Sequence, residues 1–349
     1  MQQTCPPFRA SALAVIVLLG LAGCGGGGSD EMLATETPEV DELAVDSERQ
    51  TAQAVTSSQA ASAQATANST TNACAAIRPF YWEVGDRNAR TAGGAVILGR
   101  ARAVYGPTTV VPLASASKWL YGAYVVQKKA GLLDNNDIKM LTMRSGYTSF
   151  DECQPADTVQ ACLNRGSNGA YTAAYDNSFF YDGGHMQKHA SLNGLADSNV
   201  SALAAAVRGQ LGKEIFVSYT RAQPAGGAAA SPDAYAKFLR KLMRGELRLG
   251  NMLGSHPTCT SPSECAPGEA AFSPVAMVGN LHYSLGHWIE NGPGGDGAFS
   301  SSGALGFYPW IDASRTSYGI VSRYQANGGP ASRACGQLIR KAWATGRTQ

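Results

Sequence analysis

The sequence lacks several motifs that would assign a function directly. It has no Gly-x-Ser-x-Gly turn, no Cys-x-x-Cys pair and no Gly-Lys-Ser/Thr phosphate loop. These absences exclude an α/β-hydrolase, weaken any zinc-site reading and exclude a P-loop nucleotide site. No internal repeat and no nucleic-acid-binding motif is present, and the basic residues are scattered along the chain. We therefore expect no nucleic-acid partner.

A hydrophobic run long enough to predict a membrane span is also missing. The longest apolar stretch, residues 12–23, has the length of a signal peptide and ends in "LAGC", residues 21–24. This ending resembles the bacterial lipobox, which predicts a lipoprotein signal peptide over residues 1–24 and a lipid anchor on Cys24. An ordinary signal peptide with a chance cysteine is the alternative. Gly25 after the cysteine favours the outer membrane, with the protein on its periplasmic side.

Residues 25–73 have little that could form a core. They are glycine-rich, then acidic, then a low-complexity mixture of Ala, Ser, Thr and Gln. Such segments bury too little apolar surface to offset the entropy of ordering, so we expect a disordered tether. One domain, residues 74–349, follows. It is basic, which suits either an anionic neighbourhood in the cell envelope or an ordinary solvated surface.

The domain holds six cysteines, a number that suits an oxidising compartment. Six cysteines allow fifteen pairings. Cys153 with Cys162 and Cys259 with Cys265 each close a short polar loop. Cys74 and Cys335 then remain near the two ends of the domain, where a disulfide would join its termini.

The order of predicted elements indicates an α+β fold. Strand-like segments occupy residues 79–106 and 281–322, "SKWLYGAYVVQKKAG" has helical spacing before Gly131, and residues 330–346 read as a final helix. The part between, about 132–274, reads as helices and loops. This order predicts an antiparallel β-sheet built from both chain ends and flanked by helices, with an inserted all-helical lobe.

The stretch "ASASKWLYG", residues 114–122, carries the chemistry. Ser115 and Lys118 lie three residues apart at the start of a predicted helix, so they share one face. The helix N-terminus and the exclusion of water both disfavour an ammonium, which suits Lys118 as a general base for a Ser115 nucleophile. The alternative is a capping serine beside a lysine that only extends to water.

Ser115-x-x-Lys118 resembles the Ser-x-x-Lys motif of the serine β-lactamase and penicillin-binding protein superfamily. "LTMRSGYTSF", "FFYDGG", "QPAGGAAASPDAYAKFL", "YSLGHWIE" and "SSSGALGFYPWID" follow in the order seen in the class C β-lactamase-like esterase branch. The resemblance covers residues 79–343 and implies the β-lactamase/transpeptidase-like fold.

Two further motifs of that branch are altered here. Its Tyr-x-Asn motif corresponds to Tyr181-Asp182-Gly183, with Tyr181 as the implied proton relay and a glycine where the asparagine would stand; a packed core tyrosine is the alternative. Its Lys/His-Thr/Ser-Gly motif corresponds to Ser301-Ser302-Gly303. A neutral Ser301 therefore replaces the cation that meets a substrate carboxylate. The amides of Ser115 and Ala304 are the implied oxyanion donors.

We therefore predict a serine hydrolase that acts through an acyl-enzyme on an ester or amide in the cell envelope, as a monomer without a cofactor. The substrate would be a small or peptide-like molecule. A β-lactamase or D,D-peptidase is the enzymatic alternative, and a catalytically silent binding or sensor module is the other. His185 and His189 are four residues apart, but no glutamate follows His185, so we predict no metal site there.

Overall fold

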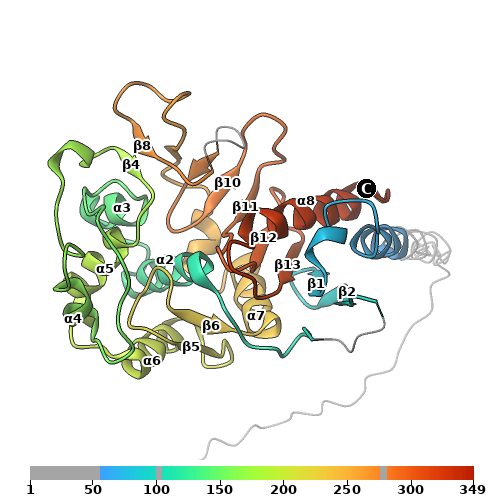
Figure 1. The fold of residues 1–349 in the computed structure, drawn as a ribbon, viewed down its shortest axis with the longest axis horizontal. Coiled ribbons are helices and arrows are strands. Elements are labelled where there is room, and N and C mark those ends of the chain that lie inside the picture. The colour runs from blue at the N-terminus through green and yellow to red at the C-terminus, as the bar shows by residue number, and fades with distance from the viewer. Residues whose placement is uncertain (1–55, 100–103, 276–280) are drawn as a thin grey trace, which may run out of the picture. The chain divides into compact units, whose positions relative to one another are not determined.

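The computed structural model describes residues 56–99, 104–275 and 281–349, which all belong to one compact unit (Figure 1). The predicted signal peptide with Cys24, and residues 25–55 of the predicted tether, lie outside the described residues. Within the described ranges, no helix has the length and apolar character needed to cross a membrane.

The main element is an eight-stranded antiparallel sheet in the order β2-β1-β13-β12-β11-β10-β9-β7. Its first two strands come from the start of the domain and the next six from beyond residue 257, so both chain ends build it, as the sequence predicts. Tyr81 of β1 pairs with Ser322 of β13. The strands are β1 (Phe80–Gly85), β2 (Arg90–Val96), β7 (Thr258–Cys259), β9 (His282–Tyr283), β10 (Trp288–Glu290), β11 (Ala298–Ser300), β12 (Tyr308–Ile311) and β13 (Tyr318–Ser322).

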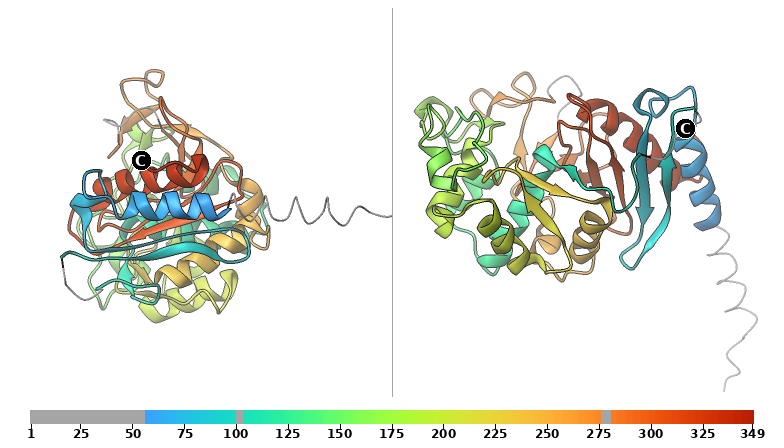
Figure 2. Two further views of the ribbon diagram at one scale, coloured as in Figure 1. Left: turned by 90° about the vertical axis from the view of Figure 1, so that its right-hand side faces the viewer. Right: turned by 60° about the horizontal axis from the view of Figure 1, so that its bottom comes forward.

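Helices cover both faces of this sheet (Figure 2). Successive side chains of a strand point to opposite faces. Trp310 of β12 therefore packs with Ile339 of α8 (Gly329–Thr345), whereas Ile311 belongs to the core that includes Phe238 of α7 (Pro232–Met243). Ser231 caps α7 by accepting a hydrogen bond from the Ala234 N–H.

Residues 56–67 form a helix, which corrects the predicted disordered tether over this part of the chain. Ala63 and Ala67 are fully buried in the same core cluster as Ile339. Ser62 Oγ donates to the Gly346 carbonyl over 2.8 Å. Ala63 and Ala67 lie on one face of this helix and are buried in the cluster that includes Ile339 of α8. The composition of the segment does not reveal this packing, because α8 is far away in the sequence.

The three predicted disulfides are all present. Cys153 joins Cys162, Cys259 joins Cys265, and Cys74 joins Cys335 across a separation of 261 residues. Three disulfides indicate an oxidising compartment outside the cytoplasm.

The inserted lobe is mostly helical but also contains strands. Its helices are α3 (Asn135–Leu141), α4 (Val159–Leu163), η3 (Ala173–Tyr175), α5 (Gly184–Ala190), η4 (Ser191–Leu195), α6 (Val200–Leu211) and η5 (Arg248–Met252). Its strands are β5 (Val217–Tyr219) and β6 (Ala228–Ala230), which form a small sheet with β3 (Val111–Pro112) from before the insert, and the parallel pair β4 (Phe179–Phe180) and β8 (Ala270–Phe272). The prediction of an all-helical insert is corrected in this respect, because strands of two or three residues are too short to show a period.

The segment "LHYSLGHWIE" differs from the single strand that its alternation predicts. It folds back on itself as β9 and β10, with Tyr283 paired to Trp288. Gly286 lies at φ +86° in the turn, a conformation that favours glycine. This hairpin brings Trp288 within ring-stacking distance of Tyr181.

Candidate active site

Ser115 and Lys118 lie at the junction of two helical segments. Ser115 belongs to η2 (Ala114–Ala116), and Lys118 to the first turn of α2 (Ser117–Lys128), which continues it. Lys118 Nζ lies 3.1 Å from Ser115 Oγ, within hydrogen-bond distance. The i, i+3 spacing thus brings the predicted nucleophile and base together.

Lys118 is enclosed by the protein. The residue is 4% exposed, and its Nζ donates to the Ala225 carbonyl over 3.0 Å. The same Nζ lies 4.7 Å from the ring centre of Tyr181. Among the described residues Lys118 forms no salt bridge. Its amine is therefore held by neutral groups, one of which is the Ser115 hydroxyl.

The backbone that presents Ser115 is held on several sides. Ala114 adopts φ +46°, an unfavourable region for a residue with a Cβ. The Tyr235 hydroxyl donates to the Ala116 carbonyl over 2.9 Å. A Cβ added at Gly122 of α2 would lie 2.3 Å from the Leu285 carbonyl oxygen, so α2 packs directly against the turn between β9 and β10.

The third predicted motif follows β11 and reaches the same place. Ser301 Oγ donates to the Ser115 carbonyl over 3.2 Å, and Ser301 is only 3% exposed. Ser301 thus contacts the Ser115 backbone and is not among the residues that line the cleft, which corrects the placement opposite a substrate carboxylate that the resemblance implies for this position. Gly303 permits this approach, because a Cβ there would lie 2.1 Å from the Leu113 carbonyl oxygen.

The second predicted motif is only partly brought to the site. Tyr181 lines the cleft and stacks on Trp288 with ring centres 5.2 Å apart. Gly183 does not line the cleft; it precedes α5, and a Cβ there would lie 2.9 Å from the Phe150 ring. Asp182 Oδ1 accepts from the Gly184 and Phe150 N–H groups, so this carboxylate stabilises the local chain.

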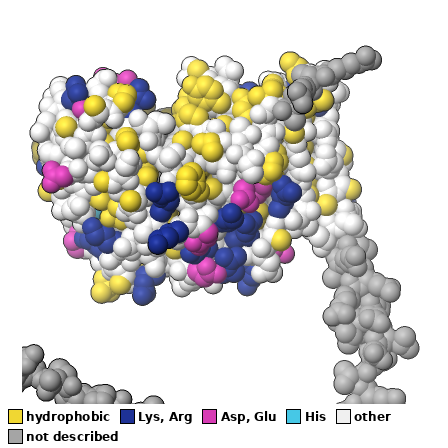
Figure 3. Space-filling model, turned by 90° about the horizontal axis from the view of Figure 1, so that it is seen from below, with side chains coloured by type: hydrophobic (Ala, Val, Ile, Leu, Met, Phe, Trp, Pro, Cys, Tyr) yellow, Lys and Arg dark blue, Asp and Glu magenta, His cyan; other side chains and the backbone are white. Residues whose placement is uncertain are grey.

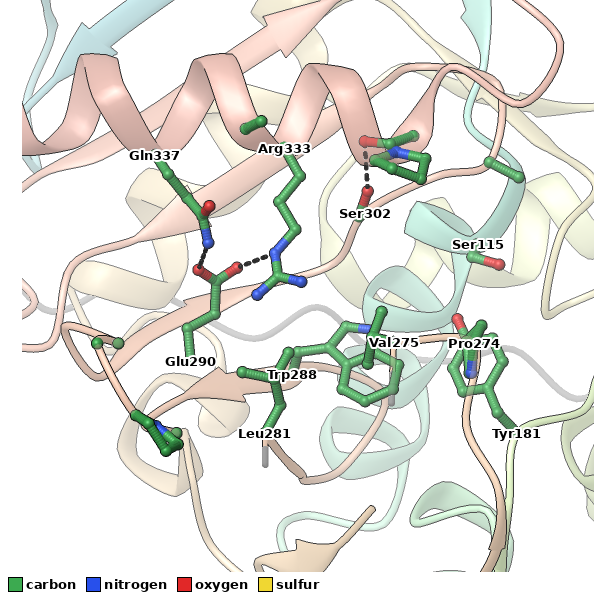
Figure 4. Close-up of a pocket in the computed structure, with 18 of the residues that line it drawn as sticks. Ser115, Tyr181, Pro274, Val275, Leu281, Trp288, Glu290, Ser302, Arg333 and Gln337 are labelled. Atoms are coloured by element: carbon green, nitrogen blue, oxygen red, sulfur yellow. Dashed lines mark hydrogen bonds and ion pairs between the residues drawn. The ribbon is translucent and has the colours of Figure 1, made fainter. Parts of the chain in front are cut away.

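A cleft of about 750 Å³ opens in front of Ser115. Tyr181, Ser302 and Ala304 are among the residues that line it. Trp288 forms part of its wall, as Figure 4 shows. In the described ranges, neither the Ser115 nor the Ala304 N–H donates a hydrogen bond to a backbone carbonyl outside its own helix or strand. Both residues line the cleft, so these two amides are available to an oxygen bound there.

The cleft also contains a charged group that the sequence did not reveal. Arg333 and Gln337 of α8 line it together with Glu290 of β10. Burial opposes ionisation of Glu290, but the charges of Arg340 and Arg333 outweigh it and lower the pKa of this carboxyl to about 2. No sequence signal marks these residues as cleft residues, because α8 and β10 are far apart in the chain and meet only in the folded domain.

The paired histidines are core residues. His185 Nδ1 accepts from the Ser145 N–H over 3.2 Å, so its Nε2 carries the proton and donates to the Phe180 carbonyl. His189 is also fully buried and contacts the Tyr121 hydroxyl and the Asp137 carboxylate. Among the described residues, only Cys259, Cys265 and Glu269 lie close enough together to share a metal ion. The two cysteine sulfurs of this group are joined to each other as a disulfide.

Basic side chains do not form a single patch on the described surface shown in Figure 3. There they lie interspersed with acidic and apolar side chains. Elsewhere among the described residues, basic side chains form ion pairs, such as Lys237 with Asp233 and Lys241 with Glu214. This face has no concentrated positive charge of the kind that binds a polyanion.

No family model matches the chain, and no curated protein sequence is similar to it. Solved structures do resemble it. A penicillin-binding protein from Bacillus halodurans superposes with a TM-score of 0.52 and 14% identity, covering 74% of this chain and 96% of that one. Unliganded simvastatin synthase (LovD) from Aspergillus terreus gives a TM-score of 0.55 and 12% identity, covering 83% and 97%.

A D-stereospecific amidohydrolase from Streptomyces sp. is similar as well, with a TM-score of 0.51, 13% identity, and coverage of 80% of this chain and 98% of that one. Identities this low demonstrate the fold alone. The chain has the β-lactamase/penicillin-binding-protein fold, with the large antiparallel sheet and helices that the sequence predicts.

Proposed function

We propose that this protein is a serine hydrolase that cleaves an ester or amide through an acyl-enzyme on Ser115. The contact between Ser115 Oγ and Lys118 Nζ, 3.1 Å long, at the edge of a cleft carries the proposal. Proteins of this fold include a D-stereospecific amidohydrolase and a penicillin-binding protein, which supports acyl transfer as the reaction type.

The reaction proceeds in two steps, acylation of Ser115 and hydrolysis of the acyl-enzyme. Ser115 Oγ attacks the substrate carbonyl while Lys118 Nζ takes the hydroxyl proton, and the new oxyanion binds the N–H groups of Ser115 and Ala304. The carbon–oxygen or carbon–nitrogen bond then breaks, and the leaving group receives a proton relayed through Tyr181. Water next attacks the acyl carbon and gives a proton to Tyr181 and Lys118. The bond between the acyl carbon and Ser115 Oγ breaks, Ser115 Oγ takes that proton back, and the acid is released.

Neutral residues at the third motif favour substrates without a carboxylate beside the scissile bond. Ser301 and Ser302 supply no charge there, and Ser301 is turned toward the Ser115 backbone. A hydrogen bond to a charged group contributes about 1.5–3 kcal/mol, so penicillins and D-Ala-D-Ala peptides lose roughly 10- to 100-fold in recognition. Esters and simple amides without such a carboxylate should be recognised as well as before.

A covalent probe tests the proposal. A fluorophosphonate should label the wild type and the Ser167→Ala variant, which alters an exposed serine, but not Ser115→Ala. A panel of p-nitrophenyl esters, anilides and a chromogenic cephalosporin then ranks substrates. Turnover retained in Ser115→Ala contradicts the mechanism. Faster acylation by the cephalosporin than by esters favours a β-lactamase, and neither labelling nor turnover favours a silent binding module.

We further propose that Cys24 anchors the protein by a lipid on the periplasmic side of the outer membrane. The "LAGC" motif with Gly25 supports this location, as do the three disulfides. The Cys24→Ser variant should leave the membrane fraction. A variant that still sediments with membranes as the wild type does would contradict the anchor.

A further inference from the structure

Arg333 brings a positive charge into the cleft from α8. Its side chain is 11% exposed and reaches from the helix into the cleft, over Trp288 (Figure 4). Its one ion pair joins Nε to Glu290 Oε1 at 3.4 Å. Within the described ranges the guanidinium donates no hydrogen bond, although it carries five N–H groups.

Glu290 does not need those N–H groups. Its oxygens accept hydrogen bonds from Ser300 Oγ and Tyr308 OH, over 2.6 and 2.8 Å. They also accept from Gln337 Nε2 and Arg340 Nη2, over 2.8 and 2.7 Å. The carboxylate is therefore ionised and fully hydrogen-bonded, and it holds Arg333 in place mainly by charge.

The wall that faces Arg333 is apolar. Trp288, Leu281, Val275 and Pro274 line the cleft there, as Figure 4 shows. Trp288 is fixed by Tyr181 on one side and by Tyr283, whose ring centre lies 4.8 Å away. An apolar part of a substrate would lie on this wall while a charged end met the guanidinium.

We infer that Arg333 binds a carboxylate carried on an apolar arm of the ester or amide substrate. Nε faces Glu290, which leaves the edge formed by Nη1 and Nη2, and its two parallel N–H groups match the two oxygens of a carboxylate. This inference rests on the proposed function, and it assigns the specificity of the same cleft to α8 instead of the third motif.

Matched substrates test it. One series places the charge on the acyl arm: p-nitrophenyl hydrogen adipate and suberate against their methyl esters. The other places it on the leaving arm: the butyrate ester of 3-(4-hydroxyphenyl)propanoic acid against that of its methyl ester. Within each pair the chain length is nearly equal, so the ratio of kcat/KM for acid over methyl ester measures recognition of the carboxylate alone.

We expect the wild type to prefer the acid at least about tenfold in one of the two series, mainly through KM. The Arg333→Gln variant should lose this preference by about 10- to 100-fold, and Arg333→Lys should keep part of it. Arg248→Gln, at an exposed arginine that lines a different hollow, should leave the ratio unchanged. Using a ratio removes the effect of any inactive enzyme in a preparation.

Two results overturn the inference: a wild-type ratio near one in both series, or a ratio that Arg333→Gln does not change. If Arg333→Gln does not fold, the wild-type ratio decides. The Ser115→Ala variant distinguishes a failure of the inference about Arg333 from a failure of the proposed function. If turnover of the methyl esters requires Ser115 but shows no preference, only the role of Arg333 fails. If turnover is absent or independent of Ser115, the proposed function fails with it.

Discussion

The hydroxyl of Ser301 donates a hydrogen bond to the backbone carbonyl of Ser115 over 3.2 Å. The two residues are 186 positions apart in the sequence. This bond joins the end of β11 to the segment that presents Ser115, the proposed nucleophile. We therefore expect Ser301 to be a positioning residue, which fixes the peptide unit next to the proposed oxyanion donor, the Ser115 N–H.

Replacing Ser301 by alanine should lower kcat while leaving KM nearly unchanged. A buried neutral hydrogen bond contributes about 0.5–1.5 kcal/mol, so we expect a decrease of roughly 2- to 10-fold. Steady-state kinetics with a neutral p-nitrophenyl ester measures both constants, and Ser167→Ala is the control. A rise in KM alone would instead assign Ser301 to substrate binding. Ser301→Lys should lower kcat more than Ser301→Ala does, because residue 301 is 3% exposed and burying an unpaired ammonium is costly.

Gly303→Ala should impair the enzyme through a clash, since its new Cβ would lie 2.1 Å from the Leu113 carbonyl oxygen. Overpacking of this kind costs about 1–3 kcal/mol of unfolding free energy, and the shift at Ala304 should lower kcat/KM at least about tenfold. Urea unfolding and ester kinetics measure the two effects. Gly209→Ala in α6 is the control, because no atom lies within 4 Å of its Cβ. Equal behaviour of the two variants would show that the approach at Gly303 is not tight.

Removing the disulfide between Cys74 and Cys335 should destabilise the domain more than removing either of the others. The bonded residues are 261 positions apart, against 6 for Cys259 and Cys265. The chain-entropy model gives about 5.5 kcal/mol for the long loop and about 2 kcal/mol for the short one. Double Cys→Ser variants compared by urea unfolding give both values. A larger loss for the short loop would contradict this ranking.

Acidification should destabilise the protein partly through His185. Burial lowers the pKa of this imidazole to about 4. Below about pH 6.5 the unfolded state binds the extra proton and the folded state does not, so stability falls as the pH drops from about 6.5 to about 4. When the pH falls from 7 to 5, the free energy of unfolding should drop by about 2 kcal/mol less for His185→Gln than for the wild type. Urea unfolding at both pH values tests this, and parallel losses would show that His185 is protonated in the fold.

The sequence by itself determined the features that depend on near neighbours in the chain. Ser115 and Lys118 meet because residues three apart share a helical face. Cys153 and Cys162 pair because the loop between them is short, which left Cys74 for Cys335. The antiparallel sheet from both chain ends followed from the order of strand-like and helical segments.

Only the tertiary structure decided which distant residues share the cleft. Ser301 turned out to contact the Ser115 backbone, and Gly183 lies outside the cleft lining. Trp288 lines the cleft because β9 and β10 form a hairpin, and Arg333 reaches it because α8 packs on the sheet. Such contacts depend on the packing of elements far apart in the sequence, and no local pattern records them. The same reason explains the helix over residues 56–67, whose alanines are buried only where α8 lies beside them.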